Sequence, residues 1–169
     1  PIVIDIGFGD AQSFTQDVAN NKNYRYIGIE PYKKGFARAE EFFEREKPEN
    51  LHQYNGDARE FLEAIAYRAS FIRIHFPDPW PKKKHIKRRL ISPAFLQLLD
   101  QKVLNKGKIE IITDSKIYQD HIDAVLCEQK LFKKIENFEI SFEVSTFHNK
   151  GLQKGHETVS YTHLRAHET

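Results

Sequence analysis

Four carboxylates stand where strand-like segments end in the first half of the chain. Asp5 lies in a short turn that contains glycines, and Glu30, Asp57 and Asp78 follow three later runs of strand length. A carboxylate offers paired acceptors to a diol or an amino group, and it attracts a cationic ligand. In an open α/β sheet, ligands bind beyond the carboxyl ends of the strands. We therefore expect these four side chains to converge on one pocket.

The turn at residues 5–11 reads Asp-Ile-Gly-Phe-Gly-Asp-Ala. Its glycines, Gly7 and Gly9, would let the backbone approach a ligand closely. Gln12 occupies the third glycine position of a dinucleotide fingerprint, and acidic residues suit a pyrophosphate poorly. The turn therefore disfavours a nicotinamide dehydrogenase and favours a ligand with positive charge or hydroxyl groups. A tight strand-to-helix turn without a ligand is the alternative.

Two further carboxylates each have a functional and a structural interpretation. Glu30 stands just over twenty residues after the glycine turn, where an acidic residue of nucleotide-binding sheets accepts hydrogen bonds from ribose hydroxyls. A solvated carboxylate at a strand end is the alternative. Asp57 either accepts from a ligand amino group or caps the helix that starts at Ala58, and capping is the commoner explanation.

The segment from residue 76 to residue 89 is the most specific feature of the chain. Three prolines surround Asp78 and Trp80, and because each ring fixes its own φ and restricts the preceding residue, this loop should hold Asp78 rigidly. Six of the eight residues from Lys82 to Arg89 are Lys or Arg, although the net charge of the whole chain is only +2. A local polycation beside a pocket indicates a nucleic-acid substrate, and a solvated basic helix face is the alternative.

These side chains need a scaffold, which the apolar periodicity predicts. Strand-like runs alternate with stretches of helical period, as in βαβ units that build a parallel sheet, and after Leu131 the period changes to two. We expect an α/β fold that is Rossmann-like and doubly wound, with a mostly parallel sheet, helices on both faces and an antiparallel C-terminal end. The expected strands are 2–6, 24–30, 51–54, 71–76 and 108–113, and the expected helices are 11–20, 34–47, 59–67, 93–104 and 116–129.

Composition limits the class of protein. A chain of 169 residues with 40% apolar residues can close one core, and no apolar run approaches the ~20 residues that cross a bilayer. The single cysteine, Cys127, excludes an internal disulfide and cysteine-cluster metal sites. We expect a cytoplasmic protein with no membrane partner and no metal, in which Cys127 is a buried helix residue.

In the right order along the chain, the motifs at residues 5–11, 28–30, 56–58, 76–89 and 113–114 form a recognisable combination. The chain resembles the bacterial tRNA (guanine-N7-)-methyltransferases, S-adenosylmethionine-dependent enzymes of the Rossmann-like class. The match extends from the first strand to about Gly155. This resemblance implies S-adenosylmethionine as cofactor, tRNA as partner and transfer of a methyl group to N7 of a guanine in the tRNA variable loop.

The resemblance also implies a role for each motif residue. Asp78 would lie where cofactor and guanine meet and would be catalytic, with Glu30 on the cofactor ribose and Asp57 near its adenine. The implied cofactor-binding residues are Asp5, Gly7, Gly9, Glu30, Asp57 and Asp78. The implied substrate contacts are Lys82, Asp114, Ser145, Thr146, Phe147 and His148, and the phosphate contacts we expect in the basic segment are Lys83, Lys84, Lys87, Arg88 and Arg89.

The chain departs from the family pattern at several points. Asp5 stands where the family commonly has Glu, Ala11 stands where Gly is usual, and residues 145–148 read Ser-Thr-Phe-His in place of a motif such as Thr-Lys-Phe-Glu. We expect the methyltransferase domain to occupy residues 1–157, with its N-terminal leader missing. We expect residues 158–169 to be an atypical, non-native tail that fits a buried strand poorly.

The chemistry agrees with a pocket of carboxylates. Guanine N7 has an in-plane lone pair and no proton to lose, so methyl transfer from a sulfonium needs alignment and electrostatic placement more than a strong base. Two other functions stay open. An Asp-Pro-aromatic loop also suits methylation of an exocyclic amino group of adenine or cytosine, and a non-catalytic RNA-binding module could keep the same fold. The sequence is compatible with a monomer or a homodimer.

Overall fold

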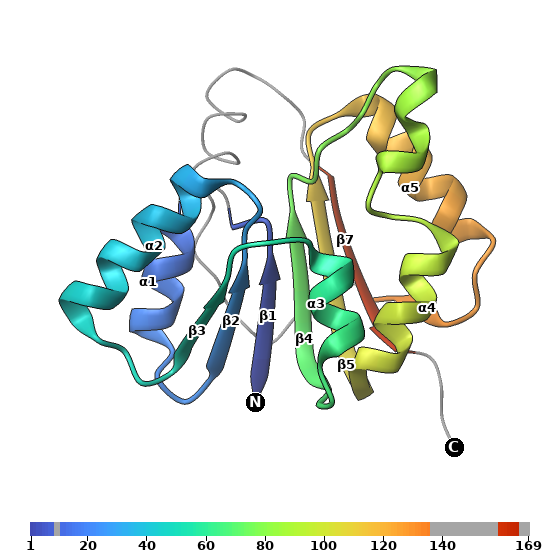
Figure 1. The fold of residues 1–169 in the computed structure, drawn as a ribbon. Coiled ribbons are helices and arrows are strands. Elements are labelled where there is room, and N and C mark those ends of the chain that lie inside the picture. The colour runs from blue at the N-terminus through green and yellow to red at the C-terminus, as the bar shows by residue number, and fades with distance from the viewer. Residues whose placement is uncertain (9–10, 136–158, 166–169) are drawn as a thin grey trace.

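The computed structural model describes residues 1–8, 11–135 and 159–165. Its centre is a seven-stranded sheet with the order β3-β2-β1-β4-β5-β7-β6. Strands β1 to β5 pair in parallel, and β7 runs antiparallel to both β5 and β6 (Figure 1). The predicted mostly parallel, doubly wound sheet with an antiparallel end is therefore confirmed. The strands are β1 (Ile2–Ile6), β2 (Arg25–Ile29), β3 (Leu51–Tyr54), β4 (Ala69–His75), β5 (Val103–Thr113), β6 (Phe132–Lys134) and β7 (Val159–Arg165).

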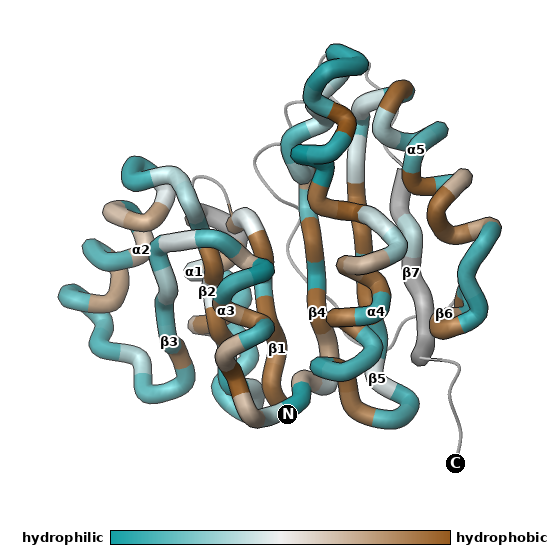
Figure 2. Tube along the Cα trace, turned by 45° about the vertical axis from the view of Figure 1, so that its right-hand side comes forward, coloured by the Kyte–Doolittle hydropathy of each residue, from teal (hydrophilic) through white to brown (hydrophobic). Residues whose placement is uncertain are grey.

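Helices cover both faces of this sheet. They are α1 (Gln12–Asn20), α2 (Lys33–Glu46), α3 (Ala58–Ala64), α4 (Pro93–Lys102) and α5 (Lys116–Cys127). Residues of α1 and α2 share one buried cluster with Val3 and Phe71, whereas residues of α3, α4 and α5 share a larger cluster with Ile4 and Ile72. Neighbouring strand residues thus enter opposite cores, as the two-residue period of a strand requires. Figure 2 shows hydrophobic stretches of β1, β4 and β5 running between the helices.

Local signals explain where several helices begin. The Ser92 hydroxyl accepts a hydrogen bond from the Phe95 amide at 3.1 Å, and Pro93 occupies the first helical position of α4. Asp57 and Ser115 cap α3 and α5 in the same way. The Ser92 cap agrees with the predicted start of this helix at residue 93.

A glycine in β2 lets the first helix approach the sheet. A Cβ atom on Gly28 would lie 2.6 Å from the Phe14 ring and 2.8 Å from the Phe8 ring, closer than real contacts allow. These two rings stack with centroids 4.6 Å apart. Gly28 therefore makes room for the aromatic pair that joins α1 and the turn before it to the sheet.

The structure corrects the expectations for the last residues of the chain and for Cys127. Residues 159–165, which we expected to fit a buried strand poorly, form β7 between β5 and β6, because pairing on both sides and burial of Tyr161 outweigh the polar composition. Cys127 ends α5 and is exposed, so its predicted burial is wrong. In the part of the chain that the structure describes, no helix has the length and apolarity needed to cross a membrane.

Candidate functional site

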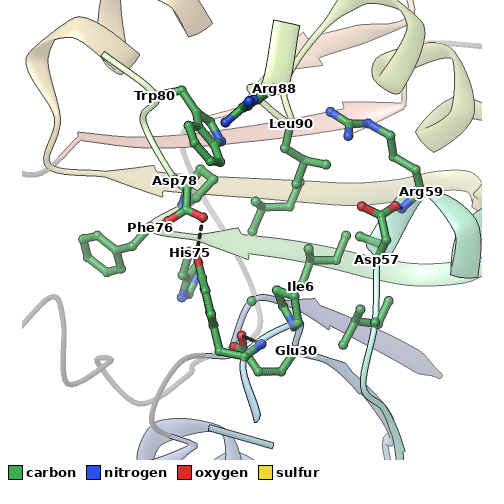
Figure 3. A pocket seen from close by; sticks show the side chains of 18 residues that line it. Ile6, Glu30, Asp57, Arg59, His75, Phe76, Asp78, Trp80, Arg88 and Leu90 are labelled. Atoms are coloured by element: carbon green, nitrogen blue, oxygen red, sulfur yellow. Dashed lines mark hydrogen bonds between the residues drawn. The ribbon is translucent and has the colours of Figure 1, made fainter. Parts of the chain in front are cut away.

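A pocket of about 320 Å³ opens at the carboxyl ends of β1, β2 and β4. Isoleucines from these three strands give it an apolar floor, and carboxylates stand around that floor (Figure 3). Three of the four carboxylates predicted to converge, Glu30, Asp57 and Asp78, do line this pocket. The apolar part of the lining includes Ile6, Ile29, Ile74, Ala58, Pro77, Trp80 and Leu90.

Glu30 is held in place at the end of β2. Its Oε1 atom accepts a hydrogen bond from the Tyr32 amide at 2.9 Å, and its carbonyl accepts from Asn55 Nδ2 at 2.7 Å. Gly7 turns the chain beside it with a φ of +73°, and the Gly7 amide donates to the Ile29 carbonyl at 2.7 Å. That φ favours glycine, which explains the glycine in the turn after β1. The buried Glu30 carboxylate thus has a fixed orientation beside the glycine turn.

Asp57 caps a helix and also lines the pocket, so its structural role is confirmed and its contact with a ligand stays a prediction. Its Oδ1 atom accepts from the amides of Arg59 at 2.8 Å and Glu60 at 3.2 Å, so Asp57 caps α3. The same residue lines the pocket. Because both capping bonds use one oxygen, the other is available to a ligand donor.

Asp78 lies in a loop whose backbone is restrained from several sides. Phe76 and Trp80 have positive φ values of 52° and 44°, a conformation that non-glycine residues rarely adopt. The Arg89 Nε atom donates to the Pro79 carbonyl at 2.9 Å, and Arg89 Nη2 donates to the Trp80 carbonyl at 3.1 Å. The loop therefore has a defined path, in agreement with the predicted stiffness.

Tyr32, which was not among the predicted site residues, reaches Asp78. The Tyr32 hydroxyl donates to Asp78 Oδ2 at 2.5 Å, marked by the dashed line in Figure 3. The hydrogen bond to Asp78, with burial and the charges of Asp78 and Glu30 adding to it, raises the pKa of Tyr32 to about 12. The hydroxyl therefore stays protonated near neutral pH. The signal that could have identified Tyr32 is its position two residues after Glu30, behind a proline.

Asp5 does not line the pocket, so the predicted convergence is wrong for this residue. Its neighbours Ile4 and Ile6 enter the larger core, whereas the Asp5 side chain is buried and accepts from Arg73 Nε at 2.7 Å. The Arg73 guanidinium also pairs with buried Asp17. Burial alone would lower the pKa of Arg73, but the two aspartates outweigh that effect and raise it. The geometry thus gives Asp5 a structural partner and no contact with the pocket.

The basic segment divides into exposed and buried side chains. Lys83–Arg88 form a short 3-10 helix, and the lysines and Arg88 in it are exposed. The Arg88 guanidinium lies over the Trp80 ring, 5.1 Å from its centroid, and both residues line the pocket. Arg89 is buried and donates to loop carbonyls. Our expectation of a phosphate contact at Arg89 is therefore wrong, because its guanidinium serves the loop.

The remaining predicted site residues are placed as follows. Lys82 is exposed just before the 3-10 helix, and Asp114 follows β5 at the same edge of the sheet, but neither lines the pocket. Gly9 and residues 145–148 lie outside the described residues. Among the described residues, no group of three or more His, Cys, Asp or Glu side chains is arranged to hold a metal ion.

This arrangement can bind a ligand that carries both an apolar ring and hydroxyl or amino groups. The isoleucine floor suits the flat face of a base, and the carboxylates of Glu30, Asp57 and Asp78 accept from the polar groups of such a ligand. The exposed cations beside the pocket favour a polyanion.

Known proteins are similar to most of this chain. A family model described as a putative methyltransferase matches residues 1–161. The tRNA (guanine-N(7)-)-methyltransferase of Nitrosococcus oceani is 35% identical over 158 residues, which are 91% of this chain and 67% of that protein. The enzyme of the same name from Wolbachia pipientis wMel is 34% identical over 155 residues, 90% of this chain and 69% of that protein. The chain thus spans about two thirds of the length of these relatives.

Solved structures support the fold independently. An rRNA methylase from Streptococcus thermophilus superposes with a TM-score of 0.67, covering 98% of this chain and 87% of that one. Its sequence identity is only 8%, so this similarity concerns the fold alone.

Proposed function

Because this chain belongs to the tRNA (guanine-N(7)-)-methyltransferase family, we propose that it transfers a methyl group from S-adenosylmethionine to N7 of a guanine in the variable loop of tRNA. The family predicted from the sequence motifs is thereby confirmed. The observation that supports the proposal most directly is the pocket that brings Glu30, Asp57 and Asp78 around an apolar floor beside exposed cations.

The residues of the pocket fit the proposed cofactor. Buried Glu30 has one oxygen held by the Tyr32 amide, so the carboxylate is oriented to accept from the two hydroxyls of a ribose. Ile29 and Ala58 offer apolar contact to an adenine, and Asp57 can accept from its amino group while it caps α3. S-adenosylmethionine would supply an activated methyl group on a sulfonium. Gly7 would let the backbone approach this ligand.

Asp78 is the residue to which we assign the catalytic role. Its side chain projects from the restrained loop between the cofactor residues and the basic segment (Figure 3). A carboxylate there can accept from guanine N1–H and the guanine amino group, which orients N7, and it stabilises the positive charge that the base gains. The N7 lone pair forms the new bond and no proton leaves the base, so Asp78 need not act as a base.

The tRNA would be held by the basic segment. Lys83, Lys84, Lys87 and Arg88 are exposed beside the pocket and would contact phosphates. Lys82, which is also exposed, and Asp114 would contact the substrate. For residues 145–148 we keep the substrate role that the family resemblance implies. A tRNA substrate is available in the cytoplasm, which we propose as the location.

Transfer of labelled methyl from S-adenosylmethionine to unmodified tRNA, followed by nucleoside analysis, tests this function. We expect label in 7-methylguanosine, and the Asp78→Asn variant should give a sharply reduced rate while its tRNA binding is retained. Label in an amino-methylated adenine or cytosine would establish the exocyclic alternative. Binding of tRNA with no binding of S-adenosylmethionine would establish a non-catalytic RNA-binding module.

A further inference from the structure

Tyr32 connects two carboxylates of the pocket that come from different strands. Its amide donates to Glu30 Oε1 at 2.9 Å, and its hydroxyl donates to Asp78 Oδ2 at 2.5 Å. Glu30 follows β2, whereas Asp78 follows β4 and is 46 residues away from Tyr32 along the chain. Tyr32 therefore links Glu30, through its backbone amide, to Asp78, through its side chain.

The exposure of this ring calls for an explanation. Tyr32 is 60% exposed, so burial of its ring in the core cannot be the reason for its position. Its backbone is nevertheless well restrained. Pro31 precedes it, its amide binds Glu30, and its carbonyl accepts from the Phe36 amide at 3.1 Å in the first turn of α2. The backbone that carries the ring is thus restrained, and the ring lines the pocket and reaches Asp78.

Asp78 needs such a partner, because the loop fixes its backbone but not its side chain. The prolines and Arg89 restrain the path of the chain, whereas the Asp78 residue itself is exposed. An exposed carboxylate samples several rotamers. Misplacement of a catalytic group by about 1 Å can reduce a rate on the order of a hundredfold. A donor that selects one rotamer of Asp78 would therefore act directly on the rate.

We propose that Tyr32 is a positioning residue for Asp78 in methyl transfer. Its hydroxyl donates to Oδ2 and so orients the carboxylate. In the described part of the chain no protein group donates to Oδ1, so this oxygen can accept from the guanine. This inference rests on the proposed function, within which it assigns a role to a residue outside the family motifs. The Tyr32 hydroxyl is protonated near neutral pH, so it can donate the hydrogen bond to Asp78.

The kinetic test removes the hydroxyl and keeps the ring. Tyr32→Phe should lower kcat for methyl transfer about tenfold, the loss expected for a hydrogen bond to a charged group. KM for tRNA and the affinity for S-adenosylhomocysteine should stay within about twofold, because the change is confined to orientation. Tyr67→Phe is the matched control, since Tyr67 is also exposed but does not line the pocket, and it should behave as the unmodified chain.

A double variant separates positioning from general structural support. If Tyr32 acts through Asp78, then adding Tyr32→Phe to Asp78→Asn should lower kcat little further, whereas independent effects would multiply. If Tyr32→Phe and an active unmodified chain have the same kcat, the role of Tyr32 is overturned while the proposed function stands. Loss of S-adenosylhomocysteine binding in Tyr32→Phe would also overturn it, because Tyr32 would then be a cofactor contact.

A titration tests the hydrogen bond without any activity. In protein with ring-labelled tyrosine, the NMR signal missing from Tyr32→Phe identifies Tyr32, and its pKa should fall from about 12 toward the ordinary 10.0 in Asp78→Asn. An ordinary pKa in the unmodified chain would show that the contact is absent and would overturn the inference. An unmodified chain that binds tRNA but transfers no methyl group, with the Tyr32 pKa still raised, would refute the proposed function together with the inference that rests on it.

Discussion

Arg73 donates its Nε hydrogen to the Asp5 carboxylate at 2.7 Å in the interior beneath α1, and its guanidinium also pairs with Asp17. All three side chains are buried. Burying ionised side chains costs stability. Removing one partner from a buried cluster of charges costs more, because the remaining charges are left uncompensated.

Replacement of Arg73 should therefore destabilise the fold strongly. Arg73→Met keeps much of the volume but leaves two buried carboxylates, and we expect a loss of about 3–5 kcal/mol in the free energy of unfolding, measured by urea denaturation. Arg45→Met is the control, since Arg45 and Glu46 form an exposed pair whose loss should cost less than about 1 kcal/mol. Similar losses in both variants would contradict a structural role for the Arg73 cluster.

Glu30→Gln should weaken cofactor binding. The amide oxygen of Gln can still accept from the Tyr32 amide, but an NH₂ group replaces the second acceptor that a ribose diol would need. We expect the Kd for S-adenosylhomocysteine, measured by calorimetry, to rise by about 10- to 100-fold. Glu41→Gln, on the exposed face of α2, should leave it unchanged. A Kd for Glu30→Gln within twofold of the control would refute the ribose assignment.

The two roles of Asp57 can be separated by two substitutions. Asn is as good a cap as Asp, so Asp57→Asn should retain the stability of the chain, whereas Asp57→Ala should lose about 1 kcal/mol with the cap of α3. Both variants should bind S-adenosylhomocysteine more weakly, because neither presents a carboxylate to an adenine amino group. Thermal unfolding and calorimetry measure the two effects. Unchanged cofactor affinity in Asp57→Asn would leave capping as the sole role of Asp57.

The sheet could be predicted well because its signals are local. Strands β1 and β3 have the predicted bounds, since each is an apolar or aromatic run flanked by turn residues, and α4 begins at Pro93 as Ser92 indicates. The convergence of Glu30, Asp57 and Asp78 followed from a topological rule that parallel strands obey. These predictions could be made from each residue and its neighbours in the sequence.

The errors concern side chains whose partners lie far away in the sequence. Asp5 was expected in the pocket, but its partner Arg73 is 68 residues away and lies on the opposite face of the sheet from the pocket floor. Arg89 ends a run of cations, and only the folded loop shows that it alone turns inward. Tyr32 was missed because its hydrogen bond to Asp78 exists only after β2 and β4 are brought together by the strand between them.

Tyr118 should make the stability of the chain fall at alkaline pH. Burial raises the pKa of Tyr118 to about 12, although the hydrogen bond from the Ile91 amide lowers it in part. Between the unfolded value of 10.0 and about 12, the folded chain keeps a proton that the unfolded chain releases. The free energy of unfolding must therefore decrease as the pH rises through this interval.

Tyr118→Phe isolates this contribution from those of other tyrosines. At neutral pH the variant should be about 1–3 kcal/mol less stable, because the buried Ile91 amide loses its acceptor. The difference from the unmodified chain should then narrow between pH 10 and about 12, as urea denaturation monitored by circular dichroism would reveal. A constant difference across that interval would mean that Tyr118 titrates normally.

The exposed lysines of the basic segment should govern the salt dependence of tRNA binding. Lys83, Lys84 and Lys87 are exposed in the 3-10 helix beside the pocket, and each phosphate contact releases counterions. Changing all three to Gln should weaken tRNA binding and reduce the slope of log K against log salt concentration by about 2. The affinity for S-adenosylhomocysteine should not change. The control changes three exposed lysines elsewhere to Gln, namely Lys22, Lys130 and Lys133, and should alter this salt slope far less. Equal salt slopes for the two triple variants would show that the basic segment is only a solvated face.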